Sequence, residues 1–359
     1  MNDFPFRNWV HIFPEYTQSN YAMSTHSDIH SASVDNERCT TGWFDTSMPD
    51  MNLSNPYLLK YFIQNAIWWI ESAGLAGIRV DTYPYSDKYA IAEWTKAIMN
   101  EYPKMNIVGE CWFQSPQEIA YWEGEAINRD GYSSHLTNVM DFPLQEALGW
   151  ALNSDGNPDW GEGLFRIYKT LSLDYIFSNP NKLLIFADNH DTNRISEILK
   201  GDKNKFKNMV NLLATIRGIP QLYYGTEIMM KTSDGKLGHG EERMDMIKRE
   251  AFTLEQEENY RYLSYLFTWR KSSNAVTKGD MKHYWPSNNL YIFVRTYKDE
   301  KVMVVVNNNT KQIELDWDRI KESIDKNEIG VDIFTKRKMV SGDNVTIEPQ
   351  SSIIIEFRK

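Results

Sequence analysis

The stretch Gly77-Ile78-Arg79-Val80-Asp81 decides the fold class that we predict for this chain. It is a short apolar run that ends in an aspartate, which is typical of a buried strand. Before it, apolar residues recur at three- and four-residue spacing. This run begins at an Asn-Pro pair and ends at Gly74, which predicts a helix over 55–74. After it, a helix is predicted near 87–101. A strand between two helices is the repeating unit of a parallel sheet.

The same alternation continues along the chain. Strands are predicted at 106–110, 138–144, 183–191 and 221–227, and helices at 116–127, 161–177 and 205–217. Such units imply an α/β fold, either a barrel or an open doubly wound sheet. Charged residues recur at the predicted carboxyl ends of the strands: Asp81, Glu110, Asp141, Asp191 and Glu227. We therefore favour a (β/α)8-type TIM barrel, because this is where such a barrel holds its catalytic groups.

The two flanks of this region have other patterns. Residues 1–54 are rich in aromatic residues, Asn, Ser, Asp and Pro without a sustained period, which predicts an irregular region inserted in the fold. After a helix near 257–270, short alternating segments separated by turns such as Asn288-Asn289 predict antiparallel strands. The predicted domains are the irregular region 1–54, a barrel catalytic domain over 55–275 and a C-terminal β-sandwich over 276–359.

Composition narrows the class of ligand. The 359 residues carry 39 Lys and Arg against 49 Asp and Glu, a net charge of −10, which disfavours nucleic acid or an anionic membrane as the main partner. Aromatic residues make up 13% of the chain, which suits surfaces that stack on sugars. No apolar run approaches the roughly 18 residues of a membrane span. Cys39 and Cys111 are too few for a disulfide framework and are predicted to be free thiols.

Two strand ends carry groups that suit acid–base and nucleophilic chemistry. Asp81 lies two residues after Arg79, on the same face of the strand, so the guanidinium would hold the carboxylate ionised and aimed. Glu110 follows Gly109, which permits close backbone approach, and precedes Trp112, a candidate platform for sugar stacking. A structural Arg/Asp pair and a helix-capping glutamate are the alternatives.

A third strand end places Asn189, His190 and Asp191 in succession. Three hydrogen-bonding side chains at one strand end indicate a binding or catalytic turn, and a purely structural polar turn is the alternative. His190 has no second His or Cys at metal-ligand spacing, which disfavours a metal centre.

Taken together, the stretches GIRVD (77–81), GE (109–110) and NHD (189–191) resemble, in the same order, conserved regions of the alpha-amylase family, glycoside hydrolase family 13. The sequence Met48-Pro49-Asp50-Met51-Asn52 resembles an additional motif of the neopullulanase and cyclomaltodextrinase branch. The resemblance extends from about residue 9 into the C-terminal β region.

The resemblance implies roles for individual residues. Asp81 corresponds to the catalytic nucleophile, Glu110 to the acid/base and Asp191 to the carboxylate that stabilises the transition state. Retaining hydrolysis uses two such carboxyl groups about 5 to 5.5 Å apart. Arg79 matches the arginine beside the nucleophile, and His190 the histidine that binds the sugar. We add three candidates for contact with substrate: Asn189, and Trp112 and Tyr83 for sugar stacking. Either aromatic residue could instead belong to the core of its loop.

One conserved region of the family, an Asp-x-x-x-Asn-His stretch, has no match upstream of Asp81. The residues before the helix at 55 also leave no room for three strand–helix units. We therefore expect an incomplete barrel with strands four to eight, and the activity of this exact chain depends on whether it works without the first three.

The predicted function is retaining hydrolysis of α-1,4-glucosidic bonds in cyclodextrins, pullulan or maltooligosaccharides. Transglycosylation by the same residues, and a non-catalytic α-glucan-binding role, are the alternatives. The resemblance implies an oligosaccharide as partner and no required cofactor. Calcium is common in the family, and we assign it no site. Relatives form homodimers, and bacterial relatives occur in both cytoplasm and periplasm, so the compartment stays open.

Overall fold

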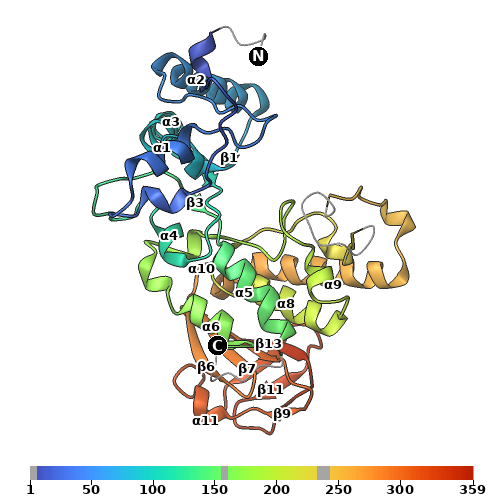
Figure 1. Ribbon diagram of the computed structural model, residues 1–359. Helices are drawn as coiled ribbons and strands as arrows, with labels where there is room; N and C mark the ends of the chain where they lie inside the picture. The colour runs from blue at the N-terminus through green and yellow to red at the C-terminus, as the bar shows by residue number, and fades with distance from the viewer. Residues whose placement is uncertain (1–5, 155–160, 233–242, 359) are drawn as a thin grey trace. The chain divides into compact units, whose positions relative to one another are not determined.

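A computed structural model describes residues 6–154, 161–232 and 243–358 (Figure 1). The chain forms two compact units. The first comprises Met1–Asp141 and Tyr175–Leu184, and the second comprises Phe142–Asp174 and Ile185–Lys359. The predicted barrel domain, 55–275, is thus divided between the two units, and its boundaries stay a prediction.

The first unit contains a parallel three-stranded sheet in the order β1-β2-β3. Its strands are β1 (Gly77–Val80), β2 (Asn106–Gly109) and β3 (Asn138–Val139), and the helices around them are α2 (Pro56–Ala73), α3 (Lys88–Glu101) and α4 (Pro116–Ala120). The predicted order of strands and helices is therefore confirmed here. The strand predicted at 138–144 is shorter, because the chain turns into a helix at Phe142.

Helix α2 begins and ends where the sequence predicts. The Asn55 side chain accepts hydrogen bonds from the backbone N–H groups of Tyr57 and Leu58, at 3.0 and 3.4 Å. Gly74 closes the helix with φ +64°, a left-handed conformation that glycine adopts without strain. The helix packs against α3, and the Trp94 indole donates to the Phe62 carbonyl.

Residues 6–54 are largely irregular, as predicted, with one helix that the sequence did not indicate, α1 (Ser33–Thr41). Backbone contacts close this region on itself. Val10 and Met51 form an isolated bridge, and the Ser19 N–H donates to the Trp43 carbonyl at 2.8 Å. The motif at 48–52 takes part in these contacts, since Oδ2 of Asp50 lies 2.7 Å from Nδ1 of His11.

The second unit contains helices α5 (Phe142–Asn153), α6 (Phe165–Leu171), α7 (Ile195–Ile198), α8 (Lys203–Thr215), α9 (Leu254–Ser272) and α10 (Asn274–Lys278), with β5 (Ile219–Pro220). Strand β4 (Leu184–Ile185) crosses the boundary between the units. The strand predicted at 183–191 is limited to β4, because its polar end folds into a turn. The strand predicted at 221–227 is wrong: β5 ends at Pro220, and the Gln221 N–H makes the last bond, to the Ile185 carbonyl.

Short 3-10 turns connect these elements. They are η1 (Arg7–Trp9), η2 (Met23–His26), η3 (Tyr83–Tyr85), η5 (Asp174–Ile176), η6 (Pro180–Lys182), η7 (Thr226–Ile228) and η8 (Arg249–Ala251).

The C-terminal part of the second unit is antiparallel, as predicted. Its six-stranded sheet has the order β11-β10-β13-β8-β7-β6, and β12 pairs with β9 in a separate two-stranded sheet. The elements are β6 (Asp280–Ser287), β7 (Leu290–Tyr297), β8 (Glu300–Asn307), β9 (Ile313–Glu314), α11 (Trp317–Ile320), β10 (Ile329–Asp332), β11 (Lys338–Val340), β12 (Thr346–Ile347) and β13 (Ser351–Arg358). Asn288 and Asn289 form the predicted turn, both with positive φ. Apolar side chains from both sheets and α11 share one buried core.

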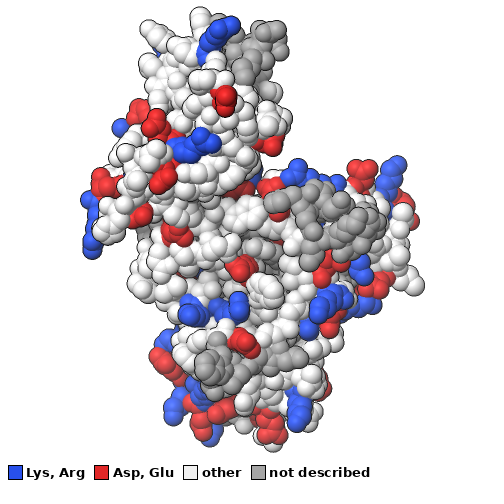
Figure 2. All heavy atoms as spheres, in the orientation of Figure 1, with Lys and Arg blue, Asp and Glu red and all other residues white. Residues whose placement is uncertain are grey.

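Three further findings concern the composition. Cys39 and Cys111 are free thiols, as predicted, and both are buried. Within the described residues, no helix is long and apolar enough to cross a membrane. On the face that Figure 2 shows, Lys and Arg are interspersed with Asp and Glu rather than gathered by sign.

Candidate functional site

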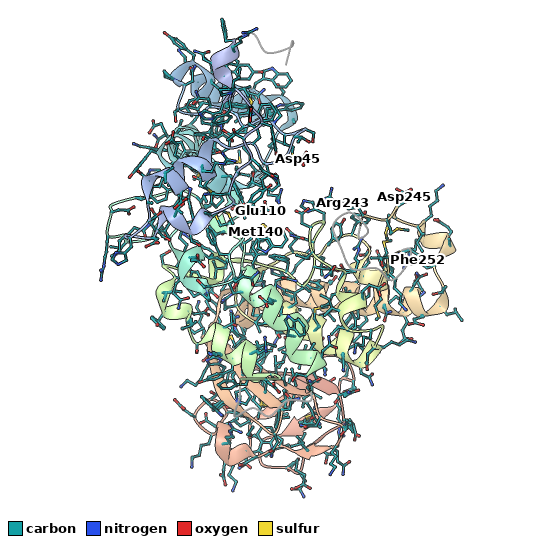
Figure 3. All side chains as sticks on the ribbon, viewed as in Figure 1. Asp45, Glu110, Met140, Arg243, Asp245 and Phe252 are labelled. Atoms are coloured by element: carbon teal, nitrogen blue, oxygen red, sulfur yellow. The ribbon has the colours of Figure 1, made fainter. Side chains whose placement is uncertain are left out.

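Backbone hydrogen bonds hold the carboxyl ends of β1 and β2 side by side. The two strands pair in parallel, with Val80 opposite Gly109. Beyond the last pair, the Glu110 N–H donates to the Val80 carbonyl at 2.9 Å, and the Tyr83 N–H donates to the Glu110 carbonyl at 3.2 Å. Because the strands are parallel, Asp81 and Glu110 leave the sheet at the same edge. Glu110 is labelled in Figure 3.

One guanidinium joins the two carboxylates. Arg79 places Nη1 2.5 Å from Oδ1 of Asp81 and Nη2 2.5 Å from Oε1 of Glu110. The Glu110 side chain is 5% exposed, whereas the Asp81 side chain is 67% exposed. The structure thus brings three predicted residues together, with one carboxylate buried and the other open to solvent.

The second oxygen of Glu110 is also held. Oε2 accepts a hydrogen bond from the Thr82 N–H at 2.9 Å. Thr82 has φ +43°, a left-handed conformation that is strained for a β-branched residue. Such strain is concentrated where a structure needs a backbone group in one particular place. Here it accompanies a backbone donor that orients Glu110.

Tyr83 does not lie where a sugar could stack on it, so that prediction is wrong. Its side chain is 1% exposed, and its hydroxyl bonds with Thr95 Oγ1 and donates to the Ser134 carbonyl, both at 3.0 Å. The turn η3 carries the ring into the interior. A Cβ on Gly109 would lie 2.5 Å from Cδ1 of Leu136, which confirms the close approach expected at this glycine. Trp112 is partly buried, and its stacking role stays a prediction.

In the second unit, Asn189 shapes the turn that carries the third carboxylate. Its Oδ1 accepts from the backbone N–H groups of Asp191 and Thr192, at 2.9 and 2.8 Å, and its own N–H donates to Thr192 Oγ1. Asn189 is buried. These bonds give its Oδ1 a role in shaping the turn, and the contact of Asn189 with substrate stays a prediction.

Both oxygens of Asp191 have partners. Nε2 of His190 lies 3.0 Å from Oδ2, and Nη2 of Arg243 lies 2.6 Å from Oδ1. Arg243 also donates from Nε to the His190 carbonyl at 2.9 Å. Sequence analysis missed Arg243, which lies 52 residues after Asp191 with no spacing or motif that points to it. It is labelled in Figure 3, and it is the first residue of the described stretch 243–358.

Two further residues that the sequence analysis missed are buried on either side of this turn in the sequence, Asp188 and Arg194. Asp188 is buried, and it accepts from the Ile195 N–H at 3.0 Å and from Thr226 Oγ1 at 2.8 Å. Burial raises the pKa of Asp188. Arg194 is buried as well, with its guanidinium 4.1 Å from the centre of the Tyr223 ring. The available signal for Asp188 was an acidic residue directly after the apolar run LLIFA (183–187).

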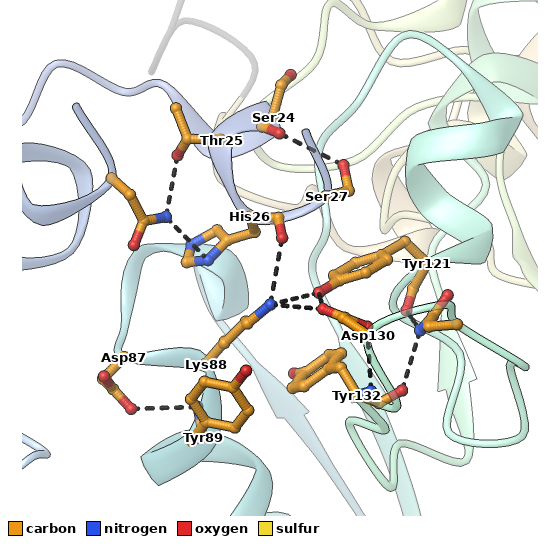
Figure 4. Close-up of polar contacts among 12 residues, drawn as sticks. Ser24, Thr25, His26, Ser27, Asp87, Lys88, Tyr89, Tyr121, Asp130 and Tyr132 are labelled. Atoms are coloured by element: carbon orange, nitrogen blue, oxygen red, sulfur yellow. Dashed lines mark hydrogen bonds and ion pairs between the residues drawn. The ribbon is translucent and has the colours of Figure 1, made fainter. Parts of the chain in front are cut away.

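A polar cluster around Lys88 ties together the segments that follow the two carboxylates of the first unit (Figure 4). The Lys88 ammonium donates to Tyr121 Oη at 2.6 Å, to Asp130 Oδ2 at 2.9 Å and to the His26 carbonyl at 3.2 Å. It also lies 5.1 to 5.3 Å from the ring centres of Tyr89, Tyr121 and Tyr132. Segment 82–88 is thereby linked to segment 111–132.

The predicted site residues thus form two groups, Arg79, Asp81 and Glu110 in the first unit, and Asn189, His190 and Asp191 in the second. Among the residues that the structure describes, no three His, Cys, Asp or Glu side chains are grouped as ligands of a metal ion. The expectation about calcium stays a prediction.

Comparison with known proteins finds two family models that match this chain. Residues 14–312 match the family model "Alpha amylase, catalytic domain", and residues 281–356 match "Cyclo-malto-dextrinase C-terminal domain". A cyclomaltodextrin glucanotransferase of Geobacillus stearothermophilus is 26% identical over 73% of this chain and 34% of its own length. An intracellular maltogenic amylase of Bacillus subtilis is 24% identical over 97% of this chain and 55% of its own. The chain thus spans about a third and about half of these relatives.

The fold has solved counterparts. The alpha-amylase from Geobacillus thermoleovorans, complexed with acarbose, aligns with a TM-score of 0.79 and 21% identity, over 100% of this chain and 73% of that one. This likeness confirms the predicted amylase-type barrel fold with a C-terminal antiparallel β region. Whether barrel strands are missing stays a prediction.

Proposed function

The chain belongs to the alpha-amylase family of glycoside hydrolases, and from this premise we propose that it carries the catalytic residues for retaining hydrolysis of α-1,4-glucosidic bonds. The substrates proposed are cyclodextrins, maltooligosaccharides and pullulan. The observation that carries the proposal is the Arg79 guanidinium that joins Asp81 to Glu110. The match of the C-terminal region to a cyclo-maltodextrinase domain supports cyclic substrates in particular.

In the proposed mechanism, the exposed Asp81 carboxylate attacks the anomeric carbon as the glycosidic bond breaks. Glu110 gives its proton to the leaving oxygen, and the departing sugar carries that proton away as a hydroxyl group. Asp81 then holds the sugar as a covalent ester. Glu110, now a carboxylate, takes a proton from water, whose oxygen attacks the anomeric carbon and releases Asp81. Asp191 would stabilise the positive charge that develops on the sugar ring.

Transfer to a sugar hydroxyl is the second candidate, because one of the relatives is named a glucanotransferase. The covalent ester is common to both reactions. The outcome depends on whether water or a sugar hydroxyl reaches the anomeric carbon first. Product analysis by chromatography separates them, since transfer yields oligosaccharides longer than the substrate.

The test is release of reducing sugar from β-cyclodextrin by this chain, by its Glu110→Gln variant and by Glu101→Gln as a control on the exposed end of α3. Glu110→Gln should lower the rate by about 10²- to 10⁴-fold, because glutamine cannot give a proton to the leaving oxygen. Glu101→Gln should keep the rate. Equal rates for the two variants would contradict the proposal, and a chain that binds maltotriose without turnover would be a glucan-binding protein instead.

A further inference from the structure

We propose that Arg243 is a positioning residue for the third carboxylate, Asp191, and that it acts on the reaction by fixing the orientation of that side chain. The proposal rests on the function proposed above. It assigns a role to a residue that no motif indicates, and all the contacts that carry it lie within the second unit.

The first observation is that Arg243 bonds at two points. Nη2 contacts Asp191 Oδ1 at 2.6 Å, and Nε donates to the carbonyl of the preceding residue, His190, at 2.9 Å. Two donors of one rigid, planar guanidinium fix both distance and direction, which a single ammonium cannot do. The Arg243 guanidinium therefore binds both the Asp191 side chain and the backbone of the turn.

The second observation concerns the other oxygen of the same carboxylate. His190 Nε2 lies 3.0 Å from Oδ2 while Arg243 holds Oδ1. The His190 contact is an ion pair only when the imidazole is protonated, whereas Arg243 donates a hydrogen bond to Oδ1 in either case. Arg243 is therefore the partner that defines the orientation of Asp191, and it comes from a distant part of the chain.

The third observation is that the segment bearing Arg243 is itself anchored. The Tyr224 hydroxyl donates to the carbonyl of Met244 at 2.7 Å. Tyr224 is held in turn by the buried Arg194, which donates to its carbonyl at 2.5 Å. The backbone next to Arg243 is therefore joined to the loop after β5, so the guanidinium is delivered to Asp191 from a supported position.

Arg249 provides a comparison within the same unit. Its side chain is 53% exposed, close to the 52% of Arg243, and it makes an ion pair with Glu257. Exposed ion pairs add little to stability. Removing either arginine should therefore leave the fold intact, and only the removal of Arg243 should affect the reaction.

The test compares kcat and KM for β-cyclodextrin among the native chain, Arg243→Met, Arg243→Lys and Arg249→Met. We expect Arg243→Met to lower kcat by about 10- to 100-fold, the range that misplacement of a reacting group produces, with a smaller change in KM. Arg243→Lys keeps the charge but not the two-point contact, so it should fall between. Melting temperatures of all variants should agree within a few degrees.

Chemical rescue gives a second measurement. Guanidinium ion at low millimolar concentration should restore part of the activity of Arg243→Ala and none to the native chain or to Arg249→Ala, because only the first variant leaves a vacant place beside Asp191. An unchanged kcat in Arg243→Met overturns the proposal while the loss in Glu110→Gln leaves the proposed function intact. If the native chain shows no turnover, the affinity for maltotriose, measured by calorimetry, tests the proposal instead. Equal affinity in Arg243→Met and Arg249→Met overturns the proposal, and so does the absence of any binding.

Discussion

At the scale of single residues, Arg79 is the group on which the candidate site depends most. A guanidinium carries several N–H donors in one planar group, so it can bind two acidic side chains at once. Arg79 does so with two separate nitrogens, one for Asp81 and one for Glu110. Its place two residues before Asp81 follows from the period of a strand, which puts both side chains on the same face.

We therefore expect Arg79→Met to lower turnover of β-cyclodextrin by about 100-fold or more, because both carboxylates lose the group that holds them in position. Arg79→Lys should be intermediate, since an ammonium keeps the charge without the fork. Initial-rate measurements check this. Arg261→Met, at an exposed arginine of α9, is the control and should match the native chain. Full activity in Arg79→Met would show that the contacts of Arg79 with Asp81 and Glu110 have only a structural role.

At the scale of elements, the irregular region before α2 is joined to the first turn after Asp81 through His26. The buried His26 ring lies with Nε2 2.7 Å from the Pro84 carbonyl and Nδ1 3.2 Å from Nδ2 of Asn36. A carbonyl only accepts and an amide nitrogen only donates, so Nε2 carries the proton and Nδ1 is free of it. This pair of bonds therefore requires the neutral imidazole.

Burial lowers the pKa of His26, an effect that the nearby Lys88 ammonium reinforces and that the Pro84 bond and Asp87 oppose. Because the unfolded chain then binds more protons than the folded one, stability is complete above the usual histidine pKa of about 6.5 and is lost as pH falls below it. We expect thermal melts between pH 7.5 and 5 to show this loss. His26→Gln should flatten the dependence, while His30→Gln, at an exposed histidine, should not. Parallel curves for the two variants would refute the assignment.

At the scale of the whole molecule, the C-terminal sheet and the helices before it belong to one compact unit. Hydrogen bonds cross between them at several places. Asn211 of α8 donates to Ser352 Oγ of β13 at 2.8 Å, and Trp269 of α9 donates to Glu356 of the same strand, also at 2.8 Å. Two elements that share buried contacts of this kind are expected to unfold together.

Ile355→Ala tests this cooperation. Ile355 is 0% exposed in the core of the sheet, so the substitution should cost about 2–5 kcal/mol of unfolding free energy. Hydrogen exchange should show amides of α8 losing protection together with those of β8 and β13. Ile329→Ala, on β10 and 59% exposed, should change the free energy of unfolding by less than about 0.5 kcal/mol. If α8 keeps its protection in Ile355→Ala, the sheet unfolds on its own.

The sequence alone predicts the alternation of strands and helices, the C-terminal antiparallel pattern and the position of Asp81 and Glu110 at strand ends. Each of these depends on spacing within a few residues. The period of a strand places Arg79 beside Asp81, and the cap at Asn55 and the glycine at 74 define α2. Such local rules act in the same way wherever the segment is packed, so they can be read without the tertiary structure.

The direction of the side chains near the carboxylates, and the distant residues that reach them, depend on the tertiary structure. Tyr83 and Asn189 lie next to candidate catalytic positions, yet both are buried because neighbouring segments pack over them. Arg243 reaches Asp191 across 52 residues of sequence. Burial and long-range hydrogen bonds depend on which segments meet in space, and no local period or spacing encodes that meeting.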